Sequence, residues 1–113
     1  QRQMCIRDSN ENTHHLINSE NLKLLKQSSV IINAARGGVV DDKALAKLLR
    51  GNKIQGAALD VFETEPMDQY SGDYFKGSDN VILTPHIGGV TFEANQQVSS
   101  MIAKKVDEHL SNL

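Results

Sequence analysis

Three charged or titratable residues of this 113-residue chain each stand at the end of a short, mainly apolar segment. Arg36 lies just beyond the first of these segments, Asp60 ends the second, and His86 lies just beyond the third. An imidazole can accept and donate a proton near neutral pH, and a guanidinium can hold a carboxylate through two parallel hydrogen bonds. These three residues are therefore candidates for a ligand site that combines a cation, an anion and a titratable imidazole.

The segments that precede these residues are predicted to form the strands that position them. Residues 30–32 are a compact β-branched run without polar alternation, which is typical of a strand buried on both faces of a parallel sheet. Residues 54–60 and 81–83 are predicted to form two further strands. Because the carboxyl ends of parallel strands meet at one edge, where open α/β sheets bind ligands, we expect the three residues to converge there.

Helices are predicted before, between and after the strands. A short helix is expected over residues 19–27, a second over 42–50, and a helical turn near 70–75. The second has the clearest boundaries, because Asp41 or Asp42 can cap its start and a glycine follows its end.

A last helix is predicted to begin near Thr91. Its apolar residues recur every three or four positions, as on one face of an amphipathic helix that must dock on something; they are Ala94, Val98, Met101, Ile102, Val106 and Leu110. The order strand, helix, strand indicates right-handed βαβ units. The predicted fold class is therefore α/β, the C-terminal half of a Rossmann-like doubly wound parallel sheet with a final amphipathic helix.

Composition excludes several classes of partner. Twelve Lys and Arg against 14 Asp and Glu give a formal net charge of −2, which offers no electrostatic reason for binding nucleic acid or an anionic membrane. No apolar run approaches the roughly 18–20 residues that span a bilayer. A single cysteine excludes an internal disulfide and suits a reducing cytoplasm, so we expect a cytoplasmic protein.

No metal site is predicted, because the four histidines lack a metal-ligand spacing with nearby carboxylates. The histidines other than His86 are interpreted as surface residues and Glu63 as solvent-facing, while Asp41 and Asp42 are explained by helix capping. Residues 1–9 follow neither a helical nor a strand period, and we interpret them as a non-native or mis-assembled leader. A native tail is the alternative.

Three segments carry a resemblance to a known family: residues 33–41 (NAARGGVVD), 58–66 (ALDVFETEP) and 83–89 (LTPHIGG). In this order they resemble the D-isomer-specific 2-hydroxyacid dehydrogenases, and most closely the D-3-phosphoglycerate dehydrogenases among them. The resemblance covers about residues 12–113. It implies that residues 10–90 are the C-terminal half of an NAD-binding domain and that 91–113 form a terminal helix, which packs back toward a substrate domain.

The resemblance implies a catalytic set of Arg36, Glu65 and His86. His86 would accept the hydroxyl proton in oxidation and donate it in reduction, while Glu65 would fix its tautomer and favour the imidazolium. Arg36 would bind the substrate carboxylate. The residues expected to face the nicotinamide end of NAD are Ala34, Ala35, Arg36, Asp60, His86, Gly88 and Gly89. Asp60 would orient the carboxamide, and the glycines would let backbone N–H groups approach the cofactor.

The glycines of this chain form no G-x-G-x-x-G fingerprint, which such a cofactor site also needs. We therefore expect this polypeptide alone to be inactive or nearly so. The residue that discriminates NAD from NADP is expected to lie, like that fingerprint, in the N-terminal half of the NAD-binding domain.

The predicted function is that of an NAD-dependent oxidoreductase fragment, acting on a small 2-hydroxy or 2-keto acid and forming a homodimer in its full-length form. The expected reaction converts 3-phosphoglycerate to 3-phosphohydroxypyruvate in serine biosynthesis. The alternatives are a glyoxylate, hydroxypyruvate or D-lactate reductase, and a non-catalytic NAD-binding module similar to a corepressor. The presence of Arg36, Glu65 and His86 together argues against the last.

Overall fold

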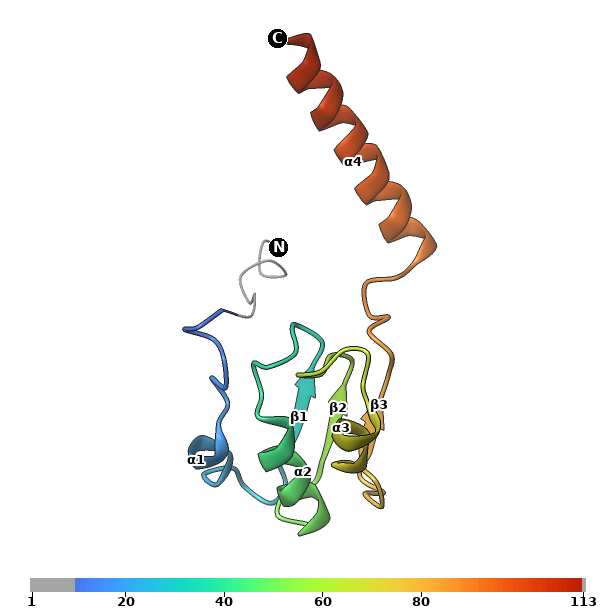
Figure 1. Cartoon of the computed structure of the whole chain (residues 1–113). Helices are drawn as coiled ribbons and strands as arrows, with labels where there is room; N and C mark the ends of the chain where they lie inside the picture. Colours follow the sequence, from blue (N-terminus) through green and yellow to red (C-terminus); the bar gives the residue numbers. More distant parts are fainter. Residues whose placement is uncertain (1–9, 113) are drawn as a thin grey trace.

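The structure, a computed structural model of the chain, describes residues 10–112 (Figure 1). Its elements are α1 (Ser19–Leu22), β1 (Val30–Asn33), α2 (Asp42–Arg50), β2 (Gly56–Leu59), α3 (Gln69–Asp73), β3 (Val81–Leu83) and α4 (Phe92–Ser111). The interpretation of residues 1–9 as a leader falls outside the described residues and stays a prediction.

The three strands form one parallel sheet in the order β1-β2-β3. Val30 pairs with Gly56 and Ala57 pairs with Val81, so each strand lies beside the next one in the sequence. Parallel neighbours need a crossover connection, and α2 provides it between β1 and β2. The predicted α/β fold class is confirmed, and the carboxyl ends of all three strands share one edge (Figure 1).

Helix α2 has the predicted bounds because local signals fix both of its ends. The side chain of Asp41 accepts a hydrogen bond from the Ala44 N–H at 2.8 Å, which caps the first turn. Gly51 follows the last turn, and its N–H bonds back to the Lys47 carbonyl at 3.1 Å. Leu45 and Leu49 point inward and are at most 1% exposed.

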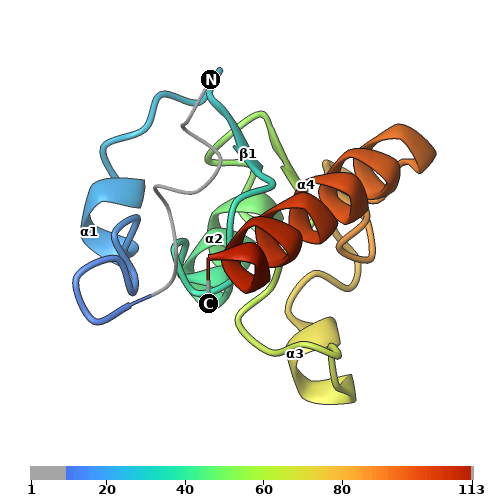
Figure 2. The same cartoon turned by 90° about the horizontal axis from the view of Figure 1, so that it is seen from above.

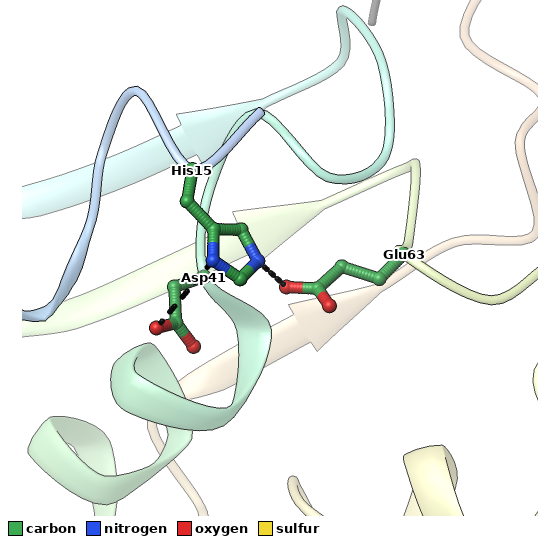
Figure 3. A group of neighbouring side chains, drawn as sticks. All are labelled: His15, Asp41 and Glu63. Atoms are coloured by element: carbon green, nitrogen blue, oxygen red, sulfur yellow. Dashed lines mark hydrogen bonds and ion pairs between the residues drawn. The ribbon is translucent and has the colours of Figure 1, made fainter. Parts of the chain in front are cut away.

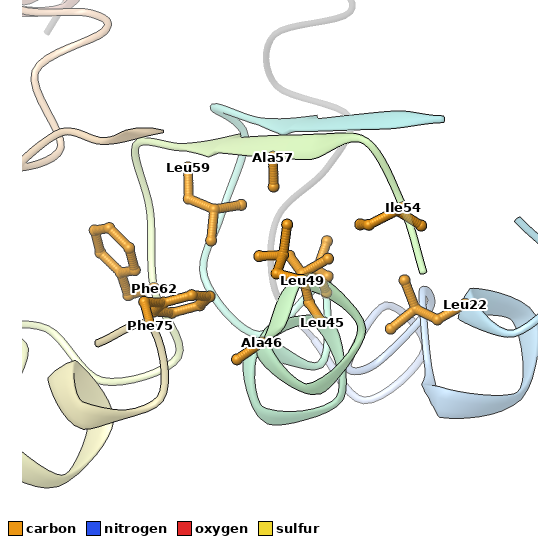
Figure 4. Close-up of a cluster of buried hydrophobic side chains, with 10 residues drawn as sticks. Leu22, Leu45, Ala46, Leu49, Ile54, Ala57, Leu59, Phe62 and Phe75 are labelled. Atoms are coloured by element: carbon orange, nitrogen blue, oxygen red, sulfur yellow. The ribbon is translucent and has the colours of Figure 1, made fainter. Parts of the chain in front are cut away.

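The core lies between α2 and one face of the sheet (Figure 4). It consists of Leu22, Val40, Leu45, Ala46, Leu49, Ile54, Ala57, Leu59, Phe62 and Phe75. The two phenylalanines come from the chain after β2 and from the turn after α3, so the core extends under the loops that carry the predicted site. Burying these side chains ties the loops to the sheet.

The other face of the sheet is not covered by any described residue. Val30, Ile32 and Ile82 are 54%, 76% and 66% exposed. The prediction that the first strand is buried on both faces is therefore wrong for residues 10–112. The apolar run has the composition of a doubly covered strand, but α1, α2 and α3 all lie on the opposite face (Figure 1).

Helix α4 begins where it was predicted, with the Thr91 hydroxyl accepting from the Ala94 N–H at 3.0 Å. It extends away from the carboxyl edge of the sheet, and in the view from above it crosses over that edge (Figures 1 and 2). No residue of Phe92–Ser111 is buried, and Val98, Ile102 and Leu110 are 51–62% exposed. The predicted docking of its apolar face on a substrate domain stays a prediction.

Helix α1 is shorter than predicted. After Leu22 the backbone changes to i→i+3 hydrogen bonds, from the Leu24 N–H to the Asn21 carbonyl and from the Leu25 N–H to the Leu22 carbonyl. These tighter turns end the helix, and they leave Leu24 83% exposed. Among the helices of residues 10–112, none has the length and apolar character required to cross a bilayer.

Candidate active site

Glu65 and His86, two members of the predicted catalytic set, are in direct contact. Glu65 Oε2 lies 2.7 Å from His86 Nδ1. The second carboxylate oxygen, Oε1, accepts the Phe62 N–H at 2.9 Å. The hydrogen bonds from His86 and Phe62 hold the pKa of Glu65 below its ordinary value, so this carboxylate is ionised at neutral pH. An ionised partner at Nδ1 leaves Nε2 as the nitrogen that can exchange a proton with a substrate.

The backbone holds His86 in an uncommon conformation. Its φ angle is 55°, in the left-handed region that non-glycine residues adopt at a cost. The His86 N–H bonds to the Thr84 carbonyl at 3.0 Å. The following two amides, of Ile87 and Gly88, donate to Asp60 at 2.9 and 2.8 Å. The strained residue is thus fixed on both sides by hydrogen bonds.

Asp60 is the anchor of this loop. It directly follows β2 and is 8% exposed, and the Thr84 hydroxyl donates to its Oδ1 in addition to the two amides. The hydroxyl and the amides together hold the pKa of Asp60 below its ordinary value. The contacts give this carboxylate a structural role that the sequence did not reveal, while its contact with a carboxamide stays a prediction.

Gly88 lies close to the same carboxylate. A Cβ at Gly88 would lie 2.9 Å from Asp60 Oδ2, so a side chain there would require the carboxylate to shift. A Cβ at Gly89 would meet nothing within 4 Å. The contact with Asp60 therefore gives a structural reason for glycine at position 88, in addition to the predicted approach of a cofactor. For Gly89, the predicted approach of a cofactor is the one reason that remains.

Arg36 lies at the same edge of the sheet, after β1. Its Nη1 donates to the Ala35 carbonyl at 2.7 Å. The loop is organised by Asn33, which is 6% exposed: its side chain accepts the Ala35 N–H at 3.1 Å and donates to the Arg36 carbonyl at 3.2 Å. Sequence reasoning missed Asn33, although a polar residue at the end of an apolar strand was a visible signal. Arg36 follows the strand farthest from β3, whereas Glu65 and His86 follow the other two.

A hollow of about 430 Å³ lies beside the ends of the strands. Three residues predicted to face the cofactor, Ala34, Asp60 and Gly88, line it together with the apolar side chains of Ile32 and Ile82. A wall of this kind fits a flat, partly apolar ring with one hydrogen-bonding edge, as in nicotinamide. A second hollow, of about 410 Å³, has Glu65 and His86 on its wall with Phe62, Met67 and Leu83.

A second histidine–glutamate contact lies outside the predicted set (Figure 3). His15 Nε2 is 2.8 Å from Glu63 Oε1, and His15 Nδ1 is 4.0 Å from Asp41 Oδ2. His15 and Glu63 lie at the surface, as interpreted from the sequence, with side chains about one-third exposed, but the contact between them was not predicted. Their separation of 48 residues hid this contact from the sequence.

Glu63 is also joined to the first residue of α2. The Asp42 N–H donates to Glu63 Oε1 at 3.0 Å, and the Glu63 N–H donates to Asp42 Oδ2 at 2.9 Å. Asp42 is 5% exposed. Burial raises the pKa of Asp42 from 3.8 to about 6, although the Glu63 N–H opposes the rise.

Replacing Asp42 with asparagine is expected to stabilise the chain at neutral pH. The folded state binds the Asp42 proton more tightly than the unfolded state, so this carboxyl favours folding fully below pH about 4 and loses that contribution as the pH rises through about 6. Asparagine stays neutral and can still accept the Glu63 N–H. We expect a gain in unfolding free energy of about 1–3 kcal/mol at pH 7 that vanishes near pH 4. Urea denaturation at both pH values measures this gain.

Asp73→Asn, on exposed α3, is the control for Asp42→Asn. A gain in unfolding free energy that is equal at both pH values would contradict the explanation.

Comparison with known proteins places this geometry in a family. The family model described as "D-isomer specific 2-hydroxyacid dehydrogenase, NAD binding domain" matches residues 4–88. Glyoxylate reductase of Pyrococcus horikoshii is 51% identical over 94 residues, which are 83% of this chain and 27% of that protein. This chain thus spans about a quarter of that relative's length.

Solved structures agree. D-lactate dehydrogenase from Aquifex aeolicus, complexed with NAD and lactic acid, is similar with a TM-score of 0.80 and 32% identity, over 92% of this chain and 35% of that one. A glyoxylate reductase from Paecilomyes thermophila has a TM-score of 0.79 and 31% identity, over 89% and 30%. The chain therefore belongs to the family of NAD-binding domains of D-isomer specific 2-hydroxyacid dehydrogenases.

Proposed function

We propose that this chain supplies the proton-transfer pair and part of the cofactor site of an NAD-dependent D-2-hydroxyacid dehydrogenase. The observation that carries the proposal is the 2.7 Å contact between His86 Nδ1 and Glu65 Oε2 at the carboxyl edge of a parallel sheet. The edge is where ligands bind in such sheets, and the ion pair orients a base there.

His86 moves the proton of the reaction. With Nδ1 donating to Glu65, Nε2 accepts the hydroxyl proton of a 2-hydroxy acid, and in the reverse direction it returns a proton to the keto oxygen. Glu65 keeps the ring oriented and stabilises the imidazolium that forms when Nε2 takes up the proton. Glu65 therefore acts through His86.

Arg36 binds the substrate. Its guanidinium can pair with the substrate carboxylate through two hydrogen bonds and polarise the C2 oxygen. The loop that Asn33 organises presents it at the edge of the sheet.

The cofactor would be held by Ala34, Ala35, Arg36, Asp60, His86, Gly88 and Gly89. NAD bound there would supply the acceptor for the hydride on C2 of the hydroxy acid. Ala34, Asp60 and Gly88 already line one hollow, and its apolar wall excludes water from one face of a bound ring.

The substrate is a small 2-hydroxy or 2-keto acid. 3-Phosphoglycerate stays the substrate that the sequence motifs predict. The relatives reported above are named for glyoxylate and D-lactate, which favours a glyoxylate, hydroxypyruvate or D-lactate reductase just as well. A homodimeric longer form and a cytoplasmic location also stay predictions.

A chimera tests the proposed function. The segment of Pyrococcus horikoshii glyoxylate reductase that is similar to this chain is replaced by the residues of this chain, and glyoxylate reduction is followed by the loss of NADH absorbance. We expect the chimera to reduce glyoxylate, because this chain supplies His86, Glu65 and Arg36 at their places. A chimera that folds and binds NADH but shows no turnover would contradict the proposed function.

A further inference from the structure

We propose that His15 and Glu63 form a second histidine–glutamate pair, which positions Glu65 for its contact with His86. This inference rests on the proposed function only for the reaction that Glu65 and His86 serve. His15 and Glu63 are positioning residues: their contacts reach His86 only through the chain and through Glu65.

The first step is the fixed geometry of the pair. His15 Nε2 and Glu63 Oε1 are 2.8 Å apart, and both side chains are about one-third exposed (Figure 3). The contact joins the segment before α1 to the loop after β2. A carboxylate acceptor makes this a charge-assisted hydrogen bond, which is stronger than one between neutral groups.

The backbone of His15 is held independently of its ring. The His15 N–H bonds to the Gly38 carbonyl at 2.7 Å, and the Ile17 N–H bonds to the Val39 carbonyl at 3.0 Å. His15 has a φ angle of 49°, an uncommon value that aims its side chain from a fixed position. Removing the imidazole therefore removes the contact with Glu63 and leaves the segment attached.

Glu63 is held by its main chain as well as by its side chain. Its N–H donates to Asp42 Oδ2 at 2.9 Å, and its Oε1 accepts the Asp42 N–H at 3.0 Å in addition to the contact with His15. Asp42 is the first residue of α2, whose inner face is the centre of the core. Glu63 thus transmits the rigid position of α2 and of His15 to the loop after β2.

Glu65 lies two residues beyond Glu63, within about 7 Å of chain. Its carboxylate bridges the Phe62 N–H at 2.9 Å and His86 Nδ1 at 2.7 Å. Both bonds need the loop from Phe62 to Glu65 in one place, because hydrogen bonds weaken steeply when the distance or the angle changes. Without the His15 contact, this loop keeps fewer anchors and the Glu65 carboxylate spends time away from His86.

A metal site fits the same residues less well. Ligand atoms of His15, Asp41 and Glu63 lie within 4.8 Å of one another. The carboxylate of Asp41, however, faces Nδ1 of His15, whereas that of Glu63 faces Nε2 (Figure 3). A metal ion binds a histidine through one ring nitrogen, so an ion on His15 would lie beside only one of the two carboxylates. Asp41 Oδ1 and Glu63 Oε1 also accept backbone N–H groups already. The arrangement is that of a hydrogen-bonded bridge.

The test measures the titration of the Glu65 carboxyl group directly, in the chain itself and without substrate or cofactor. Carboxyl resonances are followed by carbon-detected NMR over a pH titration in the unsubstituted chain, His15→Phe, His15→Gln and the remote control His109→Phe. Phenylalanine keeps a ring but donates no hydrogen bond, whereas glutamine places an N–H near the position of Nε2. In His15→Phe the pKa of Glu65 is expected to rise by about half a pH unit or more, toward its ordinary value. His15→Gln should restore it, and His109→Phe should leave it unchanged.

An unchanged Glu65 titration in folded His15→Phe overturns the positioning role, even if the chimera is active. A rise in the pKa of Glu65 that occurs equally in His15→Gln also overturns the positioning role, because the rise would then not depend on a hydrogen bond to Glu63. If His15→Phe does not fold, His15→Ala is titrated in its place. Binding of Zn²⁺ to the unsubstituted chain that His15→Gln abolishes would reassign the cluster as a metal site. An inactive chimera with the expected Glu65 shifts would contradict only the proposed function.

Discussion

Replacing His86 with glutamine is expected to lower the turnover number of the glyoxylate reductase chimera by about 10²–10⁴-fold, the usual contribution of a general acid–base group. Glutamine can keep a hydrogen bond to Glu65, whose Oε2 lies 2.7 Å from His86 Nδ1, but it cannot exchange a proton with the substrate oxygen. The loss should therefore fall on kcat, with KM changed little. Initial rates of NADH consumption over a range of glyoxylate concentrations measure both constants.

His109 provides the matched control for this prediction. It lies exposed near the end of α4, so His109→Gln changes the same residue type without touching the loop of His86. Its kcat should equal that of the chimera. A His86→Gln chimera that keeps its turnover would show that another group transfers the proton.

The chain is expected to lose most of its stability when Gly37 is replaced with alanine. A Cβ at this position would lie 1.7 Å from the carbonyl oxygen of Phe62 and 2.4 Å from its carbonyl carbon. Both are backbone atoms, so relief requires the loop after β1 to separate from the loop after β2. Such a clash belongs to the severe class of substitutions, with an expected loss of about 4 kcal/mol or more in unfolding free energy. Urea denaturation followed by circular dichroism measures it.

Gly89→Ala is the control for Gly37→Ala, since a Cβ at Gly89 meets nothing within 4 Å. It should change the unfolding free energy by less than about 0.5 kcal/mol. Equal stability of Gly37→Ala and the unsubstituted chain would show that the two loops are not in close contact in solution. The clash also adjoins Glu63, so a partly folded Gly37→Ala should lose the contact between Glu65 and His86 as well.

The parts of the fold that could be predicted are those that neighbouring residues determine. Asp41 and Gly51 mark the ends of α2, and Thr91 marks the start of α4, because capping needs only residues within a few positions. The edge that carries Arg36, Asp60 and His86 could also be predicted, because parallel strands place their carboxyl ends together. The contact between Glu65 and His86 was implied by resemblance, and the structure contains it.

The parts that could not be predicted depend on contacts between distant segments. His15 and Glu63 are 48 residues apart, and no periodicity connects them. The burial of Asp42 likewise depends on where the loop after β2 lies, although capping alone explained its position in the sequence. The uncovered face of β1 was also mispredicted. An apolar run indicates that both faces of a strand can be buried, but it does not show whether residues of the same chain bury them.

Helix α4 amplifies small movements of the loop that carries His86. Its 20 residues make a rod about 30 Å long that leaves the sheet through the segment of Gly88 and Gly89. With no buried residue to brace it, a rotation of about 10° at this joint swings the far end by about 5 Å, by simple leverage on that length. Helix α4 begins six residues after His86, so a label near Leu110 would magnify small rearrangements of the loop into displacements that a distance measurement can resolve.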